Sequence, residues 1–192
     1  CLSQTVKEVL RIPSTGDLIT ANQNFHKLLT EGVDVSYIEN SEERPVKAKL
    51  IDEHNPGNNH WCVAHQVTII ENGQQKRPDV IIYLNGLPVI VMELKNATDQ
   101  NATIEKAYQQ LQTYHKSISV LFTYNCFEII SDGLEAKAGT ITSDFSRFMS
   151  WKSADGRTLA SSKLSELGVM MEGLFTSEVL SDVILNFVVF EK

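Results

Sequence analysis

Two acidic residues and a lysine, Asp79, Glu93 and Lys95, stand close together in the chain. Asp79 begins one predicted strand, and Glu93 and Lys95 close the next. Residues two apart on a strand point to the same face, so Glu93 and Lys95 share a face. Two carboxylates on neighbouring strands can share a Mg²⁺ ion, which accepts one or two carboxylates and keeps several waters. The lysine could then orient or help deprotonate an attacking water, or stabilise negative charge on a phosphate during displacement.

The turn between the two strands decides whether Asp79 can join Glu93. A two-residue turn at Asn85-Gly86, with regular pairing on both sides, sets Asp79 opposite Met92 and leaves Glu93 on the other face. A three-residue loop over residues 85–87 sets Asp79 opposite Glu93, with Cβ atoms about 5 Å apart. We therefore predict an odd-length loop or a compensating bulge.

Each part of this pattern has an ordinary alternative. Glu-x-Lys triplets are common, and alone they fit solvated charges where a buried strand emerges. Pro78 fits the first position of any strand, where no backbone donor is needed. Only the combination, with Pro78-Asp79 on one strand and Glu93-x-Lys95 on the strand paired with it, indicates a shared site.

A second polar pair lies on the predicted helix that follows. Gln110 and Tyr114 are four residues apart and share a helix face. That face could present an amide and a phenol to a phosphate or to Lys95. Taken alone, Tyr114 fits a core aromatic residue and Gln110 a solvated one.

The elements that must position these residues follow from hydrophobic periodicity and turn signals. Helices are predicted at 22–31, 103–116, 161–175 and 177–190, and strands at 46–51, 61–70, 80–84, 89–94, 119–124 and 127–130. A loop is predicted at 54–59 and a polar turn at 71–76. The order of helix, strands, helix, strands and helices predicts an α/β fold with a mixed sheet.

Composition limits the function classes. The 192 residues are 42% hydrophobic and can bury one core, while the net charge of −7 restricts any nucleic-acid contact to a local surface. Three scattered cysteines, Cys1, Cys62 and Cys126, offer neither a disulfide framework nor a zinc site. No signal peptide or apolar run of about 18 residues occurs, so we expect a cytoplasmic protein without a membrane partner.

The motifs resemble those of the PD-(D/E)xK nuclease superfamily, in the branch with an additional Gln-x-x-x-Tyr motif. The resemblance extends to the amino-terminal part of the R subunits of type I restriction-modification enzymes, from about Asn22 to the last residue. The stretches that carry it are RPDVIIYLNGLPVIVMELKNATDQNATIEKAYQQLQTY, IISDGLEAKAGT, FSRFMSW and GLFTSEVLSDVILNFVVFE.

This resemblance implies a restriction-endonuclease-like core in which helices flank a central mixed sheet. It implies that Asp79 and Glu93 bind Mg²⁺, that Lys95 is the catalytic lysine, and that Gln110 and Tyr114 position substrate or lysine. The substrate would be double-stranded DNA, cut without intrinsic sequence specificity. The endonuclease domain would cover residues 1–150.

The resemblance also implies partners. In the family, an ATP-driven DNA translocase follows on the same polypeptide, and the subunit works with methyltransferase and specificity subunits. No GxxxxGK[ST] loop occurs, so ATP would bind beyond Lys192, and residues 151–192 would form a helical extension toward the translocase. Since the first residue is not Met, we expect a fragment of a longer polypeptide.

Two further residues are weaker candidates for the metal site. Glu31, at the end of the first predicted helix, could add a third acid, although it also fits a solvated helix end. His65 could bind metal, although it also fits a hydrogen-bonded strand histidine. Two other functions remain open: a catalytically silent docking or regulatory module on the same fold, and a DNA-repair nuclease of the same superfamily.

Overall fold

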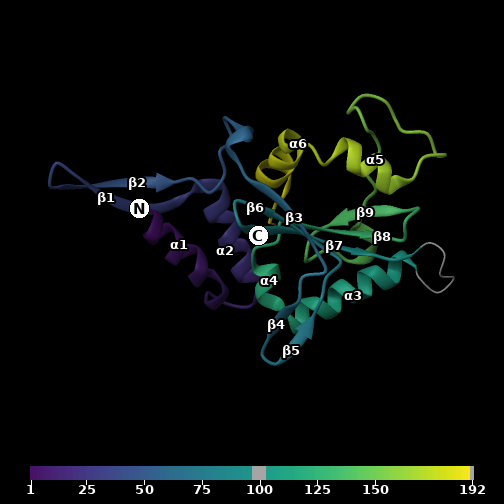
Figure 1. The fold of residues 1–192 in the computed structure, drawn as a ribbon, viewed down its shortest axis with the longest axis horizontal. Coiled ribbons are helices and arrows are strands. Elements are labelled where there is room, and N and C mark those ends of the chain that lie inside the picture. Colours follow the sequence, from purple (N-terminus) through teal and green to yellow (C-terminus); the bar gives the residue numbers. More distant parts are fainter. Residues whose placement is uncertain (97–102, 191–192) are drawn as a thin grey trace.

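A five-stranded mixed sheet forms the centre of the protein (Figure 1). The computed structural model describes residues 1–96 and 103–190. The strand order is β3-β6-β7-β8-β9; β7 and β8 are parallel and the other neighbours are antiparallel. The strands are β3 Trp61–His65, β6 Val80–Leu84, β7 Leu87–Leu94, β8 Phe127–Ser131 and β9 Ala136–Gly139. The predicted α/β fold with a mixed sheet is confirmed.

Helices cover both faces of this sheet. One face packs against α3 (Ile104–Ser117) and α4 (Ser119–Thr123). The other packs against α1 (Leu2–Arg11), α2 (Leu18–Glu31), α5 (Glu166–Gly173), α6 (Ser177–Asp182) and the π-helical turn η4 (Val183–Phe187). Short 3₁₀ turns are η1 (Ile12–Ser14), η2 (Pro56–Asn58) and η3 (Phe145–Arg147).

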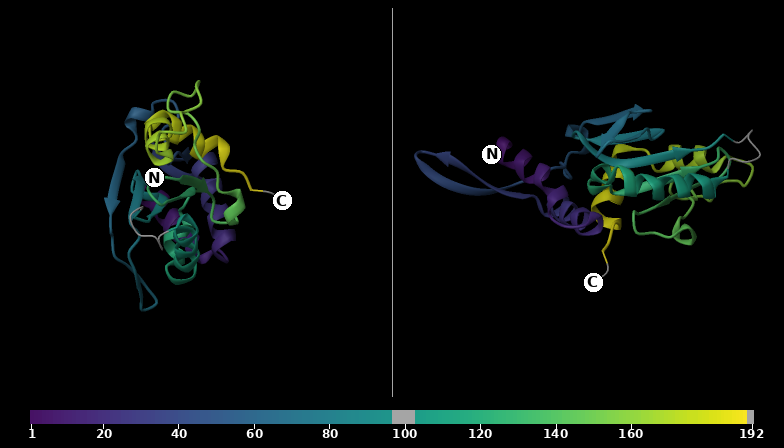
Figure 2. Two further views of the ribbon diagram at one scale, coloured as in Figure 1. Left: turned by 90° about the vertical axis from the view of Figure 1, so that its right-hand side faces the viewer. Right: turned by 90° about the horizontal axis from the view of Figure 1, so that it is seen from below.

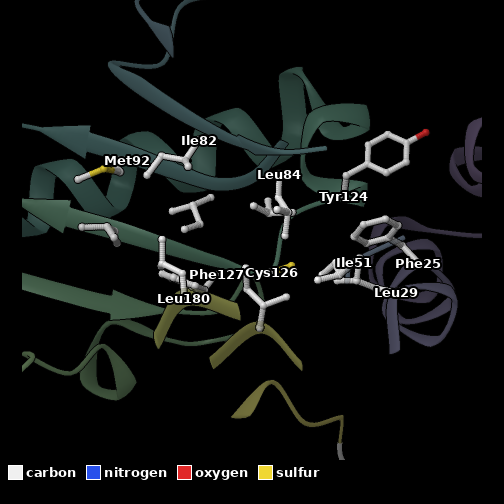
Figure 3. Close-up of a cluster of buried hydrophobic side chains, with 14 of the residues drawn as sticks. Phe25, Leu29, Ile51, Ile82, Leu84, Met92, Tyr124, Cys126, Phe127 and Leu180 are labelled. Carbon is white, nitrogen blue, oxygen red and sulfur yellow. The ribbon is translucent and has the colours of Figure 1, made fainter. Parts of the chain in front are cut away.

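Because successive side chains of a strand point to opposite faces of the sheet, each strand contributes to the hydrophobic cores on both faces. In β8, Ile129 joins the cluster that contains Phe25 of α2 and Leu180 of α6, whereas Ile130 joins the cluster of α3. Figure 3 shows part of the first cluster, which includes Phe25 and Leu29 of α2, Ile82 and Leu84 of β6 and Met92 of β7. A sheet that is buried on both faces explains why β7 is almost continuously apolar.

Two hairpins lie outside the central sheet. β1 (Val33–Glu39) and β2 (Glu42–Ala48) form an arm that extends from the body (Figures 1 and 2). β4 (Ile69–Glu71) and β5 (Gln74–Lys76) form a smaller hairpin beside the α3 and α4 layer. Glu71 ties this hairpin to α4, since its carboxylate accepts hydrogen bonds from Ser119 Oγ at 2.8 Å and from Val120 N at 3.0 Å.

The helices predicted at 22–31 and 103–116 are confirmed, with adjusted limits. The helix predicted at 22–31 lies inside α2, which begins earlier because Asp17 caps it by accepting a hydrogen bond from Thr20 N. The helix predicted at 103–116 is α3, and Thr103 caps it by accepting from Lys106 N.

Three strand predictions need correction. Residues 119–124 were predicted as a strand but form α4, because a short buried helix is as apolar as a buried strand. Residues 61–70 are not one strand, since the chain leaves the sheet at Gln66 between β3 and β4. The strand predicted at 46–51 is β2, which ends at Ala48, and part of the predicted turn at 71–76 is β5.

The carboxy-terminal helices are shorter than predicted. The stretch 161–175 is helical only in α5, and 177–190 contains α6 and η4 before an extended end. Both α5 and α6 belong to the main core, where Met170, Leu174, Leu180 and Ile184 are buried with the sheet. The boundary at residue 150 stays a prediction.

Several elements escaped prediction altogether, namely α1, β1 and β9. The three cysteines are free thiols. Among residues 1–96 and 103–190, no helix is both long and apolar enough to cross a membrane.

Candidate active site

The turn between β6 and β7 has two residues. Asn85 (φ 52°) and Gly86 (φ 85°) both take the left-handed conformation, as a type I′ turn requires. The turn therefore pairs Leu84 with Leu87. With regular pairing from there on, Asp79 and Glu93 would point to opposite faces.

A bulge corrects this register. Tyr83 pairs with Pro88, but the next pair is Ile82 with Ile90, so Val89 is an additional residue on β7. Pairing then continues regularly to Val80 opposite Met92. The next position outward sets Asp79 opposite Glu93 on the face that α3 covers. Of the two predicted alternatives, an odd-length loop or a compensating bulge, the structure has the bulge.

Backbone bonds hold Asp79 from both neighbouring strands. Its Oδ2 accepts a hydrogen bond from the Leu94 backbone N–H at 2.9 Å. Its backbone carbonyl accepts another from the Gln66 N–H, also at 2.9 Å. The carboxylate is therefore fixed at the edge of the site, where it is partly exposed.

Glu93 is the buried acid of the site. Its Oε1 accepts a 2.6 Å hydrogen bond from Lys95 Nζ within an ion pair. Its Oε2 is buried and has no hydrogen-bond partner in the described part of the chain. Burial raises the pKa of Glu93; the Lys95 ammonium opposes this change, and the negative charge of Asp79 adds to it.

Tyr114 and Gln110 reach the same site from α3. Tyr114 is buried, and its hydroxyl donates a long 3.4 Å hydrogen bond to the Arg77 carbonyl. Burial and the nearby Glu93 charge raise the pKa of Tyr114, while a polar contact from Gln110 partly offsets the rise. Tyr114 is therefore an O–H donor rather than a base.

The two carboxylates suit a small divalent cation. Lys95 offsets only one of the two negative charges, and the buried Glu93 Oε2 has no hydrogen bond in the described part of the chain, so a divalent cation would stabilise the pair. Within the described residues no cluster of three or more acid, histidine or cysteine side chains forms a metal site. Mg²⁺ needs only one or two carboxylates because it keeps several waters.

A hollow of about 410 Å³ opens beside Asp79 and Lys95. His65 contributes to its wall but pairs with Val80, so its side chain lies on the opposite face of the sheet from Asp79. Glu31 is exposed at the end of α2 and lines a different hollow, so the structure does not bring it to the two carboxylates. The lining residues of the first hollow are His65, Gln66, Asp79, Val80, Leu94, Lys95 and Asn96.

Two neighbours of the site were not recognised in the sequence. Gln66 lines the hollow with Asp79, and its only sequence signal is its position at the end of a strand. Lys137 shares a row with Glu93, because Glu93 pairs with Ile130 and Ile130 with Lys137. Its ammonium lies 3.0 Å from Glu135 and 5.4 Å from the centre of the Phe145 ring. Only the order of the strands reveals this placement.

Comparison with known proteins points to one family. Residues 2–147 match the family described as type I restriction enzyme R protein N terminus. The chain is 40% identical over 181 residues to the type I restriction enzyme HindI endonuclease subunit of Haemophilus influenzae, which covers 92% of this chain and 17% of that subunit.

More distant relatives carry the same kind of name. The putative type I restriction enzyme MjaIXP endonuclease subunit of Methanocaldococcus jannaschii is 32% identical over 187 residues, covering 88% of this chain and 18% of that subunit. The type I restriction enzyme SsaAORF53P endonuclease subunit of Staphylococcus saprophyticus is 29% identical over 140 residues, covering 64% of this chain and 14% of that subunit. The chain thus spans less than a fifth of the length of these relatives.

Proposed function

The chain belongs to the family of type I restriction enzyme R protein N termini, and we propose that it is the Mg²⁺-dependent nuclease domain of a restriction enzyme. Its reaction is hydrolysis of phosphodiester bonds in double-stranded DNA. The observation that carries this proposal is the bulged hairpin, which brings Asp79 opposite Glu93 with Lys95 at 2.6 Å from Glu93.

Asp79 and Glu93 would hold the metal ion. When bound, Mg²⁺ supplies a Lewis acid that polarises the phosphate and favours ionisation of a coordinated water. The Asp79 carboxylate is already oriented by the Leu94 N–H, so one of its oxygens is directed before any ligand arrives. Glu93 offers its buried Oε2, which has no other partner in the described part of the chain.

Lys95 and the α3 residues would act on the substrate. In the proposed reaction a water oxygen bonds to phosphorus, and the bond from phosphorus to the leaving deoxyribose oxygen breaks. The Lys95 ammonium, on the same face as Glu93, is placed to orient the water and to stabilise the additional negative charge. The Tyr114 hydroxyl and the Gln110 amide add neutral donors that position Lys95 or the phosphate.

We further propose that other parts of the assembly choose where DNA is cut. A net charge of −7 gives this chain little general affinity for DNA, so other parts of the assembly would hold the duplex, and this site would cut without sequence specificity of its own. Its relatives are more than five times longer, which leaves room for an ATP-driven translocase on the same polypeptide. Methyltransferase and specificity subunits would complete a cytoplasmic restriction complex.

The test is cleavage by the full-length protein in its complex. Asp79→Ala, Glu93→Ala and Lys95→Ala should each abolish cutting in Mg²⁺ while ATP hydrolysis by the complex continues, which shows that the variants assemble. Glu31→Ala is the matched control, because it removes an exposed carboxylate that faces a different hollow. Normal cutting by all three site variants would reject the proposal and favour a noncatalytic docking module.

A further inference from the structure

Gln66 has an unusual backbone conformation. Its φ is +51°, in the left-handed region that side-chain-bearing residues rarely adopt. The other residues with side chains and positive φ in the described chain, Asn40, Ser41, Asn72 and Asn85, all lie in two-residue hairpin turns. Gln66 is in no hairpin turn, and glutamine lacks the local side-chain bonds that help asparagine tolerate this conformation. A conformation that costs free energy at an exposed residue suggests a functional constraint.

This conformation lies at the edge of the proposed site. Gln66 follows β3 and donates its backbone N–H to the Asp79 carbonyl at 2.9 Å. The chain then leaves the sheet, and Val67 and Ile69 pack against the α3 side. Gln66 itself stays exposed in the hollow that Asp79 and Lys95 line.

We propose that Gln66 is a substrate-contacting residue whose side-chain amide donates hydrogen bonds to a phosphate oxygen of the DNA backbone at the cleavage site. This inference rests on the proposed nuclease function. The carboxamide offers two N–H donors and carries no charge. A lysine or arginine at the same position would pair with Asp79 and compete with the metal ion for its carboxylate. A neutral donor binds phosphate without that competition.

Three substitutions at Gln66 separate the effect of the side-chain amide from that of the backbone conformation. For each variant, steady-state DNA cleavage is measured with the full-length enzyme in its complex. Gln66→Ala removes the amide and keeps the unfavourable φ, whereas Gln66→Gly removes both. Both should lower kcat/KM for cleavage about tenfold or more, the loss expected for a hydrogen bond to a charged group. Gln66→Asn keeps an amide on a residue that accepts positive φ, so it should retain more activity than either.

The salt dependence of DNA binding provides a second readout. Because Gln66 is neutral, its loss should leave the slope of log affinity against log salt unchanged. Asn72→Gly in the β4–β5 turn is the matched control, since it relieves a φ of +48° away from the hollow. Its cleavage should equal that of the wild type.

The outcomes distinguish this inference from the function on which it rests. If Gln66→Gly cleaves normally and Gln66→Ala does not, the residue has only a conformational role and the proposal is wrong. Normal cleavage by both variants also overturns it. Lys95→Ala is measured in parallel: if that variant cuts DNA, the nuclease assignment itself fails, whereas its inactivity beside normal Gln66 variants refutes only the role of the amide.

Discussion

Glu93 and Lys95, two residues apart on β7, form an ion pair of 2.6 Å between an acid that is 5% exposed and a base that is 25% exposed. The base can reach solvent while the acid cannot. The pairing therefore compensates only part of the cost of burying the carboxylate, and burial still raises the pKa of Glu93. Because the site destabilises the fold when no metal ion is bound, both metal binding and neutralisation of Glu93 should raise the melting temperature.

Glu93→Gln should raise the melting temperature of the chain at pH 8 in EDTA. A carboxyl group with a raised pKa destabilises the fold above that pKa, and the penalty disappears as pH falls below the unfolded-state value of about 4.3. Differential scanning calorimetry should show a rise of about 2–4 °C for each kcal/mol gained in a chain of this size. The difference should vanish near pH 4.

Adding Mg²⁺ should raise the melting temperature of the wild type above that of Glu93→Gln. A cation that binds only the folded wild type raises its melting temperature with concentration, whereas Glu93→Gln should not respond. Glu31→Gln, at an exposed position, is the control and should shift the free energy of unfolding by less than about 0.5 kcal/mol. A Glu93→Gln protein that melts below the wild type at pH 8 in EDTA would contradict this account.

Tyr114→Phe should separate catalysis from stability. The variant keeps the buried ring and loses a hydroxyl whose 3.4 Å bond to the Arg77 carbonyl is long, so the free energy of unfolding should fall by less than about 1 kcal/mol. The cleavage rate should fall about tenfold, because the hydroxyl faces the Glu93 charge.

The same variant tests the protonation state of Tyr114. Its raised pKa keeps the hydroxyl protonated, so the ratio of wild-type to Tyr114→Phe rates should stay constant from pH 7 to pH 9. Rate profiles in parallel buffers measure this ratio. A ratio that changes steadily toward pH 9 would mean that the phenolate forms in the working range.

The local part of the site could be predicted from the sequence because its geometry depends on a short segment. Asp79, Glu93 and Lys95 lie on one hairpin, and the period of two along a strand, together with the turn, leaves few registers. That pairing predicted either an odd-length loop or a compensating bulge. The position of the bulge at Val89 could not be predicted, since a bulge can be accommodated at several places along an apolar strand.

The parts that escaped prediction depend on tertiary packing. Residues 119–124 read as a strand because both buried strands and buried helices are apolar, and packing against α2 decided the outcome. Lys137 reaches the row of Glu93 only through the order β7-β8-β9, which no local pattern encodes. The left-handed conformation of Gln66 likewise has no signature in neighbouring residues.

Gly86→Ala should destabilise the hairpin that carries the site. The position has a φ of +85°, and a Cβ atom there would contact nothing within 4 Å, so the cost is conformational rather than steric. We expect a loss of about 1 kcal/mol in urea unfolding, with an unchanged response to Mg²⁺. Gly57→Ala is the control, since it also has open space but no positive φ; an equal loss there would refute the conformational explanation.

His26 should make the fold sensitive to acid. The imidazole is buried on α2, where Nε2 lies 3.3 Å from the Asn125 carbonyl, and burial lowers the pKa of His26 to about 4. Between about pH 6.5 and pH 4, His26 is protonated in the unfolded chain but not in the folded chain. The free energy of unfolding therefore falls as pH decreases, by about 1.4 kcal/mol per pH unit. His26→Gln has no proton to bind and should flatten this part of the curve. Urea unfolding at half-unit pH steps measures both slopes, and parallel curves for the two proteins would show that the fold does not lower the pKa of His26.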